Sequence, residues 1–383
     1  MKTLFFALLL ISISFPSCGQ PQLTVITNVD VFDGSTVREN VHVVFDKNGI
    51  IDIHKKKKKY RNAVLIDGSG KTVLPPMINA HVHVASPDNL KEALQVGIFA
   101  LMDMFSVDRR ANNLRKFNDS LVYAHFYSSN VGATVPGGHG TQYGVAIPTV
   151  NDSVSASEFV RDRINNGADY IKIAQEHTMA KLSAAQLEEL ITATHHNGKI
   201  ALAHISALSE ARELAVLNVD GLAHIWYRKL SVSTERDIAL FKEKKCFIIP
   251  TLSVIRRLID YTHENNIDDN LLRFEEVLQE VNKAYKAGIP ILAGTDARNF
   301  GMNYSTQYFE EFTFLSDAGM SNIDILKSGT SNIWNAFHLK EFQHVAKGGA
   351  ASFILIDGKP HLNIADIRNK KRIWKQGTEI DVS

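Results

Sequence analysis

The sequence predicts an α/β fold, namely a (β/α)8 TIM barrel with a small composite β-sandwich domain formed by both chain ends. Two observations predict it. Eight short apolar stretches alternate with helical patterns after Pro75, and strand-like segments flank this region on both sides. Strands that alternate with helices pair in parallel, and eight such units close into a barrel. We therefore expect a barrel over residues 75–344 and a β-domain built from residues 22–74 and 345–383, because neither end alone has enough apolar residues for a core.

Composition excludes several classes of protein. The chain has 383 residues, of which 45% are hydrophobic and 22% charged, which is typical of a globular protein. Lys and Arg number 42 against 41 Asp and Glu, so no basic excess points to nucleic acid. The cysteines are Cys18 and Cys246, too few for a disulfide framework or a cysteine zinc site. Cys246 lies in an apolar run and is expected to be buried and inert.

The N-terminus resembles a targeting segment. Lys2 precedes the apolar run 4–13, which is too short to span a bilayer but fits a signal-peptide core. Ser17-Cys18-Gly19 follows and resembles a bacterial lipoprotein cleavage site. We expect residues 1–18 to be a signal peptide and Cys18 to attach the exported chain to a membrane, in the periplasm, outer membrane or cell surface. Ordinary secretion with cleavage nearby is the alternative.

The first β-segment contains strand and turn signals. Residues 41–45 are rich in β-formers, and residues 46–49 have turn chemistry. Five consecutive lysines follow at positions 55–59. We interpret them as a solvated loop between two strands; attraction to an anionic lipid surface is the alternative.

The central region supplies the barrel elements. The eight predicted strands are residues 77–83, 98–104, 121–127, 169–174, 200–205, 221–226, 246–252 and 290–296. Helix signals separate them. Ser183 and Gln186 form a capping box, and Asn197-Gly198 ends that helix. After about residue 345 the strand pattern returns, over residues 351–356 and 372–377.

Six side chains that are costly to bury fall at or near the ends of five predicted strands. Barrel enzymes place their chemistry at the C-terminal ends of the strands. Residues two apart on a strand share a face, so His81 and His83 can reach one metal ion. Lys172 stands between Ile171 and Ile173, where an ammonium must lose its charge, find an anion or be modified. The other three are His204, His224 and Asp296. A single histidine at such a position is usually a core residue, but six side chains that are costly to bury, all at or near strand ends, together predict a metal site.

These residues lie in motifs that resemble the amidohydrolase superfamily. Segment 74–83 (LPPMINAHVH) resembles its opening motif, with Pro76 where Gly is usual and Asn79 where Asp is common. Segments 167–173 (GADYIKI), 201–204, 219–224 and 294–296 resemble the motifs of strands four, five, six and eight. Segment 348–360 resembles a motif of the composite β-domain, although Gly349 and Ser352 replace its usual Lys and Asp.

Within the superfamily, the chain looks similar to imidazolonepropionase-like and Xaa-dipeptidase-like enzymes. Segments 136–140 (PGGHG) and 249–252 (IPTL) are typical of that branch, and Lys172 favours the binuclear dipeptidase side. Gln175-Glu176-His177 stands where many members carry a glycine pair.

The resemblance implies two divalent ions, most consistent with Zn2+. His81, His83 and Asp296 would hold one ion, His204 and His224 the other, and carbamylated Lys172 would bridge them. Two dications lower the pKa of a shared water and so supply hydroxide at neutral pH. Asp296 would also carry a proton from the water to the leaving nitrogen.

Three further residues are predicted to meet the substrate. His139, in a glycine-rich loop, could donate to the carbonyl oxygen as charge develops there, or merely stabilise the loop. Tyr227 could hydrogen-bond a substrate carboxylate, or pack at the rim. Arg298 is a candidate clamp for a carboxylate.

The sequence thus predicts an exported hydrolase of C–N bonds in a small substrate, such as a dipeptide, an N-acyl amino acid or a cyclic amide. A lactonase or esterase acting on C–O or P–O bonds, and a binding lipoprotein without catalysis, are the alternatives. The leaving group, the native metal and the oligomeric state do not follow from the sequence.

Overall fold

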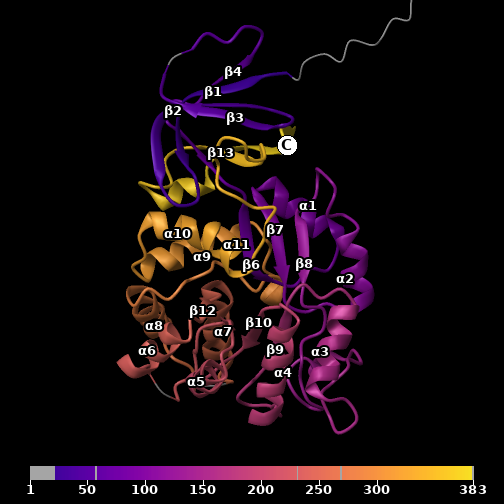
Figure 1. Ribbon diagram of the computed structural model, residues 1–383. Coiled ribbons are helices and arrows are strands. Elements are labelled where there is room, and N and C mark those ends of the chain that lie inside the picture. Colours follow the sequence, from indigo (N-terminus) through magenta and orange to yellow (C-terminus); the bar gives the residue numbers. More distant parts are fainter. Residues whose placement is uncertain (1–21, 57, 231, 268–269, 382–383) are drawn as a thin grey trace, which may run out of the picture.

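The computed structural model describes residues 22–56, 58–230, 232–267 and 270–381 (Figure 1). The predicted signal segment 1–18 and Cys18 lie outside these ranges. Within them, none of the helices is long and apolar enough to cross a membrane. Cys246 is buried as predicted, and burial raises the pKa of its thiol to about 12.

Both chain ends contribute strands to one eight-stranded sheet, which Figure 1 shows in indigo and yellow side by side. Its order is β15-β14-β13-β5-β1-β2-β3, and β4 also pairs with β1. The strands are β1 (Thr24–Phe32), β2 (Val37–Asp46), β3 (Gly49–His54), β4 (Val64–Asp67), β5 (Lys71–Leu74), β13 (Phe353–Asp357), β14 (Lys371–Lys375) and β15 (Thr378–Ile380).

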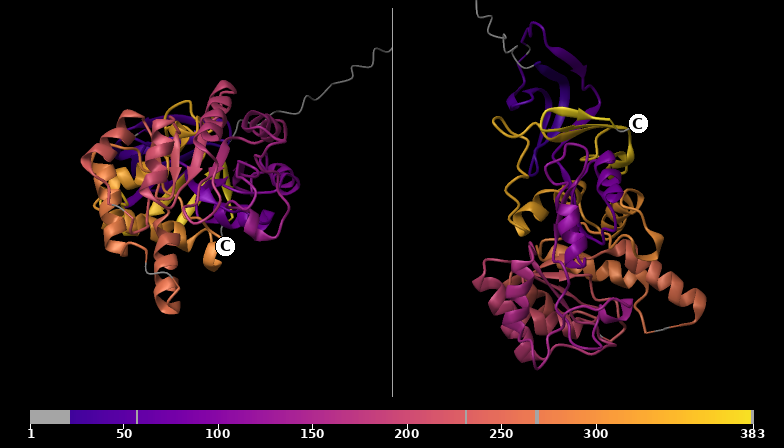
Figure 2. Two further views of the ribbon diagram at one scale, coloured as in Figure 1. Left: turned by 90° about the horizontal axis from the view of Figure 1, so that it is seen from below. Right: turned by 90° about the vertical axis from the view of Figure 1, so that its right-hand side faces the viewer.

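The two ends share one apolar core. Phe45 packs against Phe353 and Trp374, with ring centroids 4.9 and 5.6 Å apart, and all three side chains are buried. Because β5 hydrogen-bonds to both β1 and β13, the strands of the predicted composite β-domain form one connected sheet. The right-hand view of Figure 2 shows this sheet at one end of the molecule and most helices at the other.

The central region forms two arcs of parallel strands. The first arc has the order β6-β7-β8, and the second β12-β11-β10-β9. Their strands are β6 (Met77–Val82), β7 (Ile98–Asp103), β8 (His125–Ser128), β9 (Ile171–Ala174), β10 (Ala201–His204), β11 (Gly221–Ala223) and β12 (Phe247–Ile249). Single parallel bridges connect the arcs, Ala133 with Ile173 on one side, and Ile248 with Ile291 and Val82 with Ala297 on the other.

The predicted barrel is therefore confirmed in part. Alternating strands and helices are present, but the described residues form no continuous closed ladder. The eighth predicted strand, residues 290–296, makes isolated backbone contacts only. Pro290 lacks an N–H, and Gly294 lies so close to its neighbours that a Cβ there would meet His81 N at 2.9 Å. The third strand begins at His125 rather than at residue 121, since residues 121–123 form a turn.

Helices surround the arcs. They are α1 (Pro87–Gln95), α2 (Asp108–Arg115), α3 (Ala156–Asn165), α4 (Ala184–His196), α5 (Leu208–Val216), α6 (Glu235–Glu243), α7 (Leu252–Asn265), α8 (Phe274–Lys286), α9 (Thr306–Asp317), α10 (Asn322–Ser328) and α11 (Ser331–Ala336), with 3-10 turns η1 (Thr141–Tyr143), η2 (Asn299–Gly301) and η3 (Ile364–Arg368). The predicted capping box of α4 is confirmed, because Ser183 and Gln186 exchange hydrogen bonds between side chain and backbone.

Candidate functional site

A cavity of about 350 Å³ opens at the carboxyl ends of the parallel strands. All six predicted metal-site residues and the predicted substrate residue His139 line it. The rest of the lining is Met104, Phe105, Val107, Arg110, Gly132, Gly140, Tyr143, Val145, Ala174 and Asn299. The structure therefore brings together side chains that lie far apart in the sequence, up to the 215 positions between His81 and Asp296.

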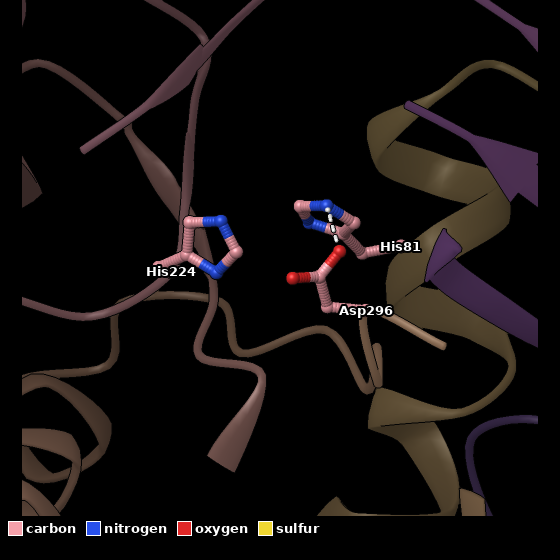
Figure 3. A group of neighbouring side chains, drawn as sticks. All are labelled: His81, His224 and Asp296. Carbon is pink, nitrogen blue, oxygen red and sulfur yellow. Dashed lines mark ion pairs between the residues drawn. The ribbon is translucent and has the colours of Figure 1, made fainter. Parts of the chain in front are cut away.

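His81, His83 and Asp296 converge on one point. Asp296 Oδ1 lies 3.2 Å from His81 Nε2 and 2.9 Å from His83 Nε2. Figure 3 shows His81 and Asp296 facing His224 across the site. The backbone of Asp296 is fixed by a hydrogen bond from its N–H to the carbonyl of His81 (2.8 Å). Behind it, Asn79 donates to Thr295 Oγ1 at 3.0 Å, so the residue that replaces Asp in the opening motif links the first and last barrel segments.

Burial sets the protonation of this group. Burial lowers the pKa of His81 to about 3, so its imidazole is neutral. The pKa of His83 would also fall by burial, but the hydrogen bond and charge of Asp296 raise it. Burial alone would raise the pKa of Asp296, whereas the two histidines lower it well below its ordinary value. A carboxylate and neutral imidazole are the forms that bind a divalent cation.

His204 and His224 face each other on the next two strands, with ring centroids 4.6 Å apart. His224 Nδ1 lies 2.6 Å from Thr251 Oγ1, and the Thr251 hydroxyl donates to the Pro250 carbonyl at 2.8 Å. Since the hydroxyl proton is already used, His224 Nδ1–H must donate to Thr251, which leaves Nε2 with a free lone pair. His224 thus has one nitrogen held and the other available as a ligand.

Lys172 is buried in the middle of the site, with 6% of its surface exposed. Its Nζ has no hydrogen-bond partner among the described residues. Burial lowers the pKa of its amine to about 7, so a neutral amine is accessible at physiological pH. Such an amine can react with carbon dioxide, whereas an ammonium cannot.

The side chains fit a metal centre. Two of their buried polar atoms, His81 Nδ1 and Lys172 Nζ, lack a hydrogen-bond partner within the described part of the chain. Unpaired buried polar atoms are costly unless something else satisfies them. Imidazole nitrogens and a carboxylate oxygen are ligands that suit zinc.

The ring of His139 stacks on the ring of His204, but the nitrogen lone pairs of the two rings do not point to a common position. The two rings are stacked, with centroids 4.2 Å apart and planes 16° apart. Imidazole lone pairs lie in the ring plane, so those of two parallel rings do not point to one ion. Burial lowers the pKa of His139 to about 3, which makes it a neutral donor at the cavity wall.

The other two predicted substrate residues lie outside the cavity lining. Tyr227 is buried, with 7% of its surface exposed, and Arg298 is exposed beside the lining residue Asn299. Arg110, at the start of α2, is instead the guanidinium in the lining. Its place in the helix sequence Asp108-Arg109-Arg110 gave no signal that would separate it from a solvated surface residue.

Glu176 is a second residue of the site to which the sequence pattern assigned no role. Its side chain is buried, and Oε2 lies 3.2 Å from His204 Nε2. Burial alone would raise the pKa of its carboxyl, but hydrogen bonds from His204 and Ser206 and the charge of Arg228 lower it below the ordinary value. The signal that could have found it is the acidic residue in place of the glycine pair.

Comparisons with known proteins agree with this geometry. Residues 72–380 match the amidohydrolase family. A Xaa-Pro dipeptidase with methionine in its active site has a similar structure, with a TM-score of 0.79 and 20% identity over 94% of this chain and 100% of that chain. The ochratoxinase of A. niger gives 0.77 and 18% over 94% and 96%, and a molinate hydrolase 0.77 and 16% over 94% and 95%. At these identities the likeness shows a shared fold. A comparison with curated proteins gives no match.

Proposed function

Because this chain belongs to the amidohydrolase family, and is therefore a hydrolase acting on carbon–nitrogen bonds, we propose that it cleaves the amide bond of a small substrate that carries a carboxylate. Dipeptides and N-acyl amino acids are the substrate classes in question. The observation that carries the proposal is the cavity at the strand ends, whose lining contains the six proposed metal ligands, one guanidinium and several apolar side chains.

The donor set supports a pair of divalent cations, with zinc as the proposed metal. His81, His83 and Asp296 would hold one ion, and His204 and His224 the other. Carbamylated Lys172 would bridge them, because a carbamate offers two oxygens and a negative charge where the amine offers neither. When bound, such ions supply Lewis acidity that polarises a carbonyl and makes water a nucleophile at neutral pH.

The protein's own residues would then handle the protons. Asp296 has one oxygen toward the histidines, while its Oδ2 accepts a hydrogen bond from Asn299 at 2.8 Å. This fixed carboxylate can take a proton from the attacking water and pass it to the leaving nitrogen. The protonated nitrogen then leaves as a neutral amine, which is a weaker base and a better leaving group than an amide anion. His139, a neutral donor in the cavity wall, would hydrogen-bond the carbonyl oxygen as negative charge develops on it.

Arg110 supports a substrate with a carboxylate. A guanidinium binds a carboxylate through two parallel hydrogen bonds. We propose Arg110 for the role that the sequence predicted for Arg298, because Arg110 lines the cavity and Arg298 does not. Met104, Phe105 and Val145 would pack against the apolar part of the substrate. We also propose export of the chain, with attachment through Cys18, on the pattern of residues 1–18 alone.

The test is turnover on a matched panel with metal content measured on the same samples. Dipeptides, N-acyl amino acids, a cyclic amide and a lactone would be compared with carboxamide versions of the first two. We expect hydrolysis of free-acid amides, and a raised KM in Arg110→Ala for these but not for their carboxamides. Arg298→Ala is the matched control and should behave as the wild type. Faster turnover of the lactone than of any amide would contradict the proposal.

A further inference from the structure

The two oxygens of the Glu176 carboxylate have different partners: Oε1 accepts hydrogen bonds, and Oε2 contacts His204. Glu176 follows β9 and is 7% exposed. Its Oε1 accepts hydrogen bonds from Ser206 Oγ at 2.9 Å and from Arg228 Nη2 at 3.3 Å. Its Oε2 lies 3.2 Å from His204 Nε2. One oxygen is thus anchored by two donors, and the other meets a predicted metal ligand.

This contact determines which nitrogen of His204 carries the proton. A carboxylate beside a guanidinium only accepts hydrogen bonds, so His204 Nε2 must be the donor. A neutral imidazole has one N–H, and its lone pair is therefore on Nδ1. Since His224 is fixed by Thr251 with the lone pair on Nε2, both histidines have one nitrogen held by a partner and the other free.

Glu176 contacts His204 without lining the cavity itself. It is not among the residues that line the cavity, whereas His204 is. Its anchors, Ser206 and Arg228, lie on the chain just after β10 and β11, the two strands that end in His204 and precede His224. The carboxylate therefore ties the ends of β9, β10 and β11 together beside His204.

We propose that Glu176 is a positioning residue of the second metal site, which holds the His204 ring in place and fixes the tautomer that presents Nδ1. This inference rests on the proposed metal centre. A carboxylate that accepts the second N–H of a ligating histidine orients the ring and raises its basicity, and the loss of such a partner typically costs about 10–100-fold in metal affinity.

The experiment compares Glu176→Gln with Glu210→Gln in the full chain. Glu210 is the matched control, since it is a buried carboxylate 1% exposed in the same network, but it accepts hydrogen bonds from the backbone of Ser206 and Ala207, at 2.9 and 3.0 Å. Zinc per chain would be measured across a series of buffered free zinc concentrations. The visible spectrum of the cobalt-loaded protein and the thermal midpoint of the metal-free protein would be recorded for each variant.

We expect Glu176→Gln to weaken one of the two zinc-binding steps, that of the His204 and His224 site, about 10–100-fold, to leave the other step in place and to alter the cobalt spectrum. Glu210→Gln should keep both steps and the spectrum, even where its metal-free midpoint falls. Wild-type affinity and spectrum in Glu176→Gln would overturn the inference. So would loss of both ions in both variants in step with the thermal midpoint, which indicates a structural role only.

Two other outcomes separate this inference from its premises. Complete loss of the second step in Glu176→Gln would mark a direct ligand and overturn the positioning role. A wild-type chain that binds fewer than two zinc ions overturns the inference together with the proposed centre. A wild-type chain that binds two zinc ions, yet hydrolyses no amide of the panel, contradicts only the proposed substrate class.

Discussion

Lys172 is a lysine within the buried apolar strand β9. Its position between Ile171 and Ile173 predicts from sequence alone that its charge is disfavoured, and the structure adds that Nζ is buried without a hydrogen-bond partner in the described part of the chain. An ordinary core would pair or replace such a lysine. A modified lysine that serves as a bridging ligand accounts for both observations.

We expect Lys172→Ala to lose the second zinc ion and nearly all activity, because the bridge between the ions is gone. A short carboxylic acid in the buffer should restore part of the rate by supplying the missing oxygens. Lys172→Arg should fail in the same way without recovery, since a guanidinium stays charged and forms no carbamate. Zinc per chain, and rates with and without the acid, are the measurements; two ions and full activity in Lys172→Ala would exclude this bridge.

His139 should act on the substrate and not on the metal. His139→Ala removes a neutral donor from the cavity wall, and loss of one such donor typically lowers kcat about 10²–10³-fold. Its ring is parallel to that of His204, so metal content should change little. Rates and zinc per chain would be measured on the same samples; parallel loss of zinc and activity would show that His139 is a ligand.

The residues of the candidate site differ in how far sequence could predict them. The six proposed ligands stand at strand ends in recognisable motifs, and all six line one cavity. The contacts of Glu176 could not be predicted from the sequence, because its partners His204, Ser206 and Arg228 are 28 to 52 positions away and only folding brings them together. Arg298 is a candidate because it follows Asp296 by two residues, but Asp296 has a positive φ of 60°, and Arg298 lies outside the lining.

At the scale of elements, the sequence predicts strands better than it predicts their pairing. Seven of the eight central stretches contain a strand, and α4 begins and ends where its caps indicate. Residues 290–296 are apolar enough for a strand, yet Pro290 and the tight packing of Gly294 limit them to isolated contacts. Periodicity reports which face is buried, but it does not report how closely two backbones approach.

Helix α7 depends on a neighbouring helix for its N-terminal cap. Thr251, which precedes it, makes no side-chain cap, and Glu311 of α9 accepts hydrogen bonds from the N–H groups of Leu252 and Ser253 at 2.9 and 2.8 Å. Burial outweighs these hydrogen bonds and raises the pKa of Glu311 to about 7. The folded chain therefore holds this proton more tightly than the unfolded chain, whose carboxyl titrates near its ordinary value.

A group with a raised pKa in the folded state contributes stability at low pH and loses it as the pH rises through the folded pKa. We expect the free energy of unfolding of the wild type to fall relative to that of Glu311→Gln by about 2–3 kcal/mol between pH 5 and pH 8. Denaturant unfolding of both proteins across that range is the measurement. Parallel curves would show that Glu311 does not titrate there.

At the scale of the whole molecule, the candidate metal centre draws its side chains from both arcs of parallel strands. His81 and His83 come from the first arc, Lys172, His204 and His224 from the second, and Asp296 from the segment that touches both. Hydrogen-bonded ladders hold each arc together, and isolated bridges with further backbone hydrogen bonds join the two arcs. Bound ions would therefore add cross-links between the two arcs.

Removal of metal should accordingly destabilise the whole chain, with effects beyond the cavity. A ligand that binds only the folded state stabilises it by mass action, by about 2.7 kcal/mol when its free concentration is 100 times Kd. We expect dialysis against a chelator to lower the thermal midpoint, and added zinc to restore it in proportion to the logarithm of its free concentration. In the double variant His81→Ala with His224→Ala, which lacks one proposed ligand from each arc, added zinc should no longer raise the midpoint. A zinc response that persists there would place the stabilising ion elsewhere, and the cavity would then lose its role as the link between the arcs.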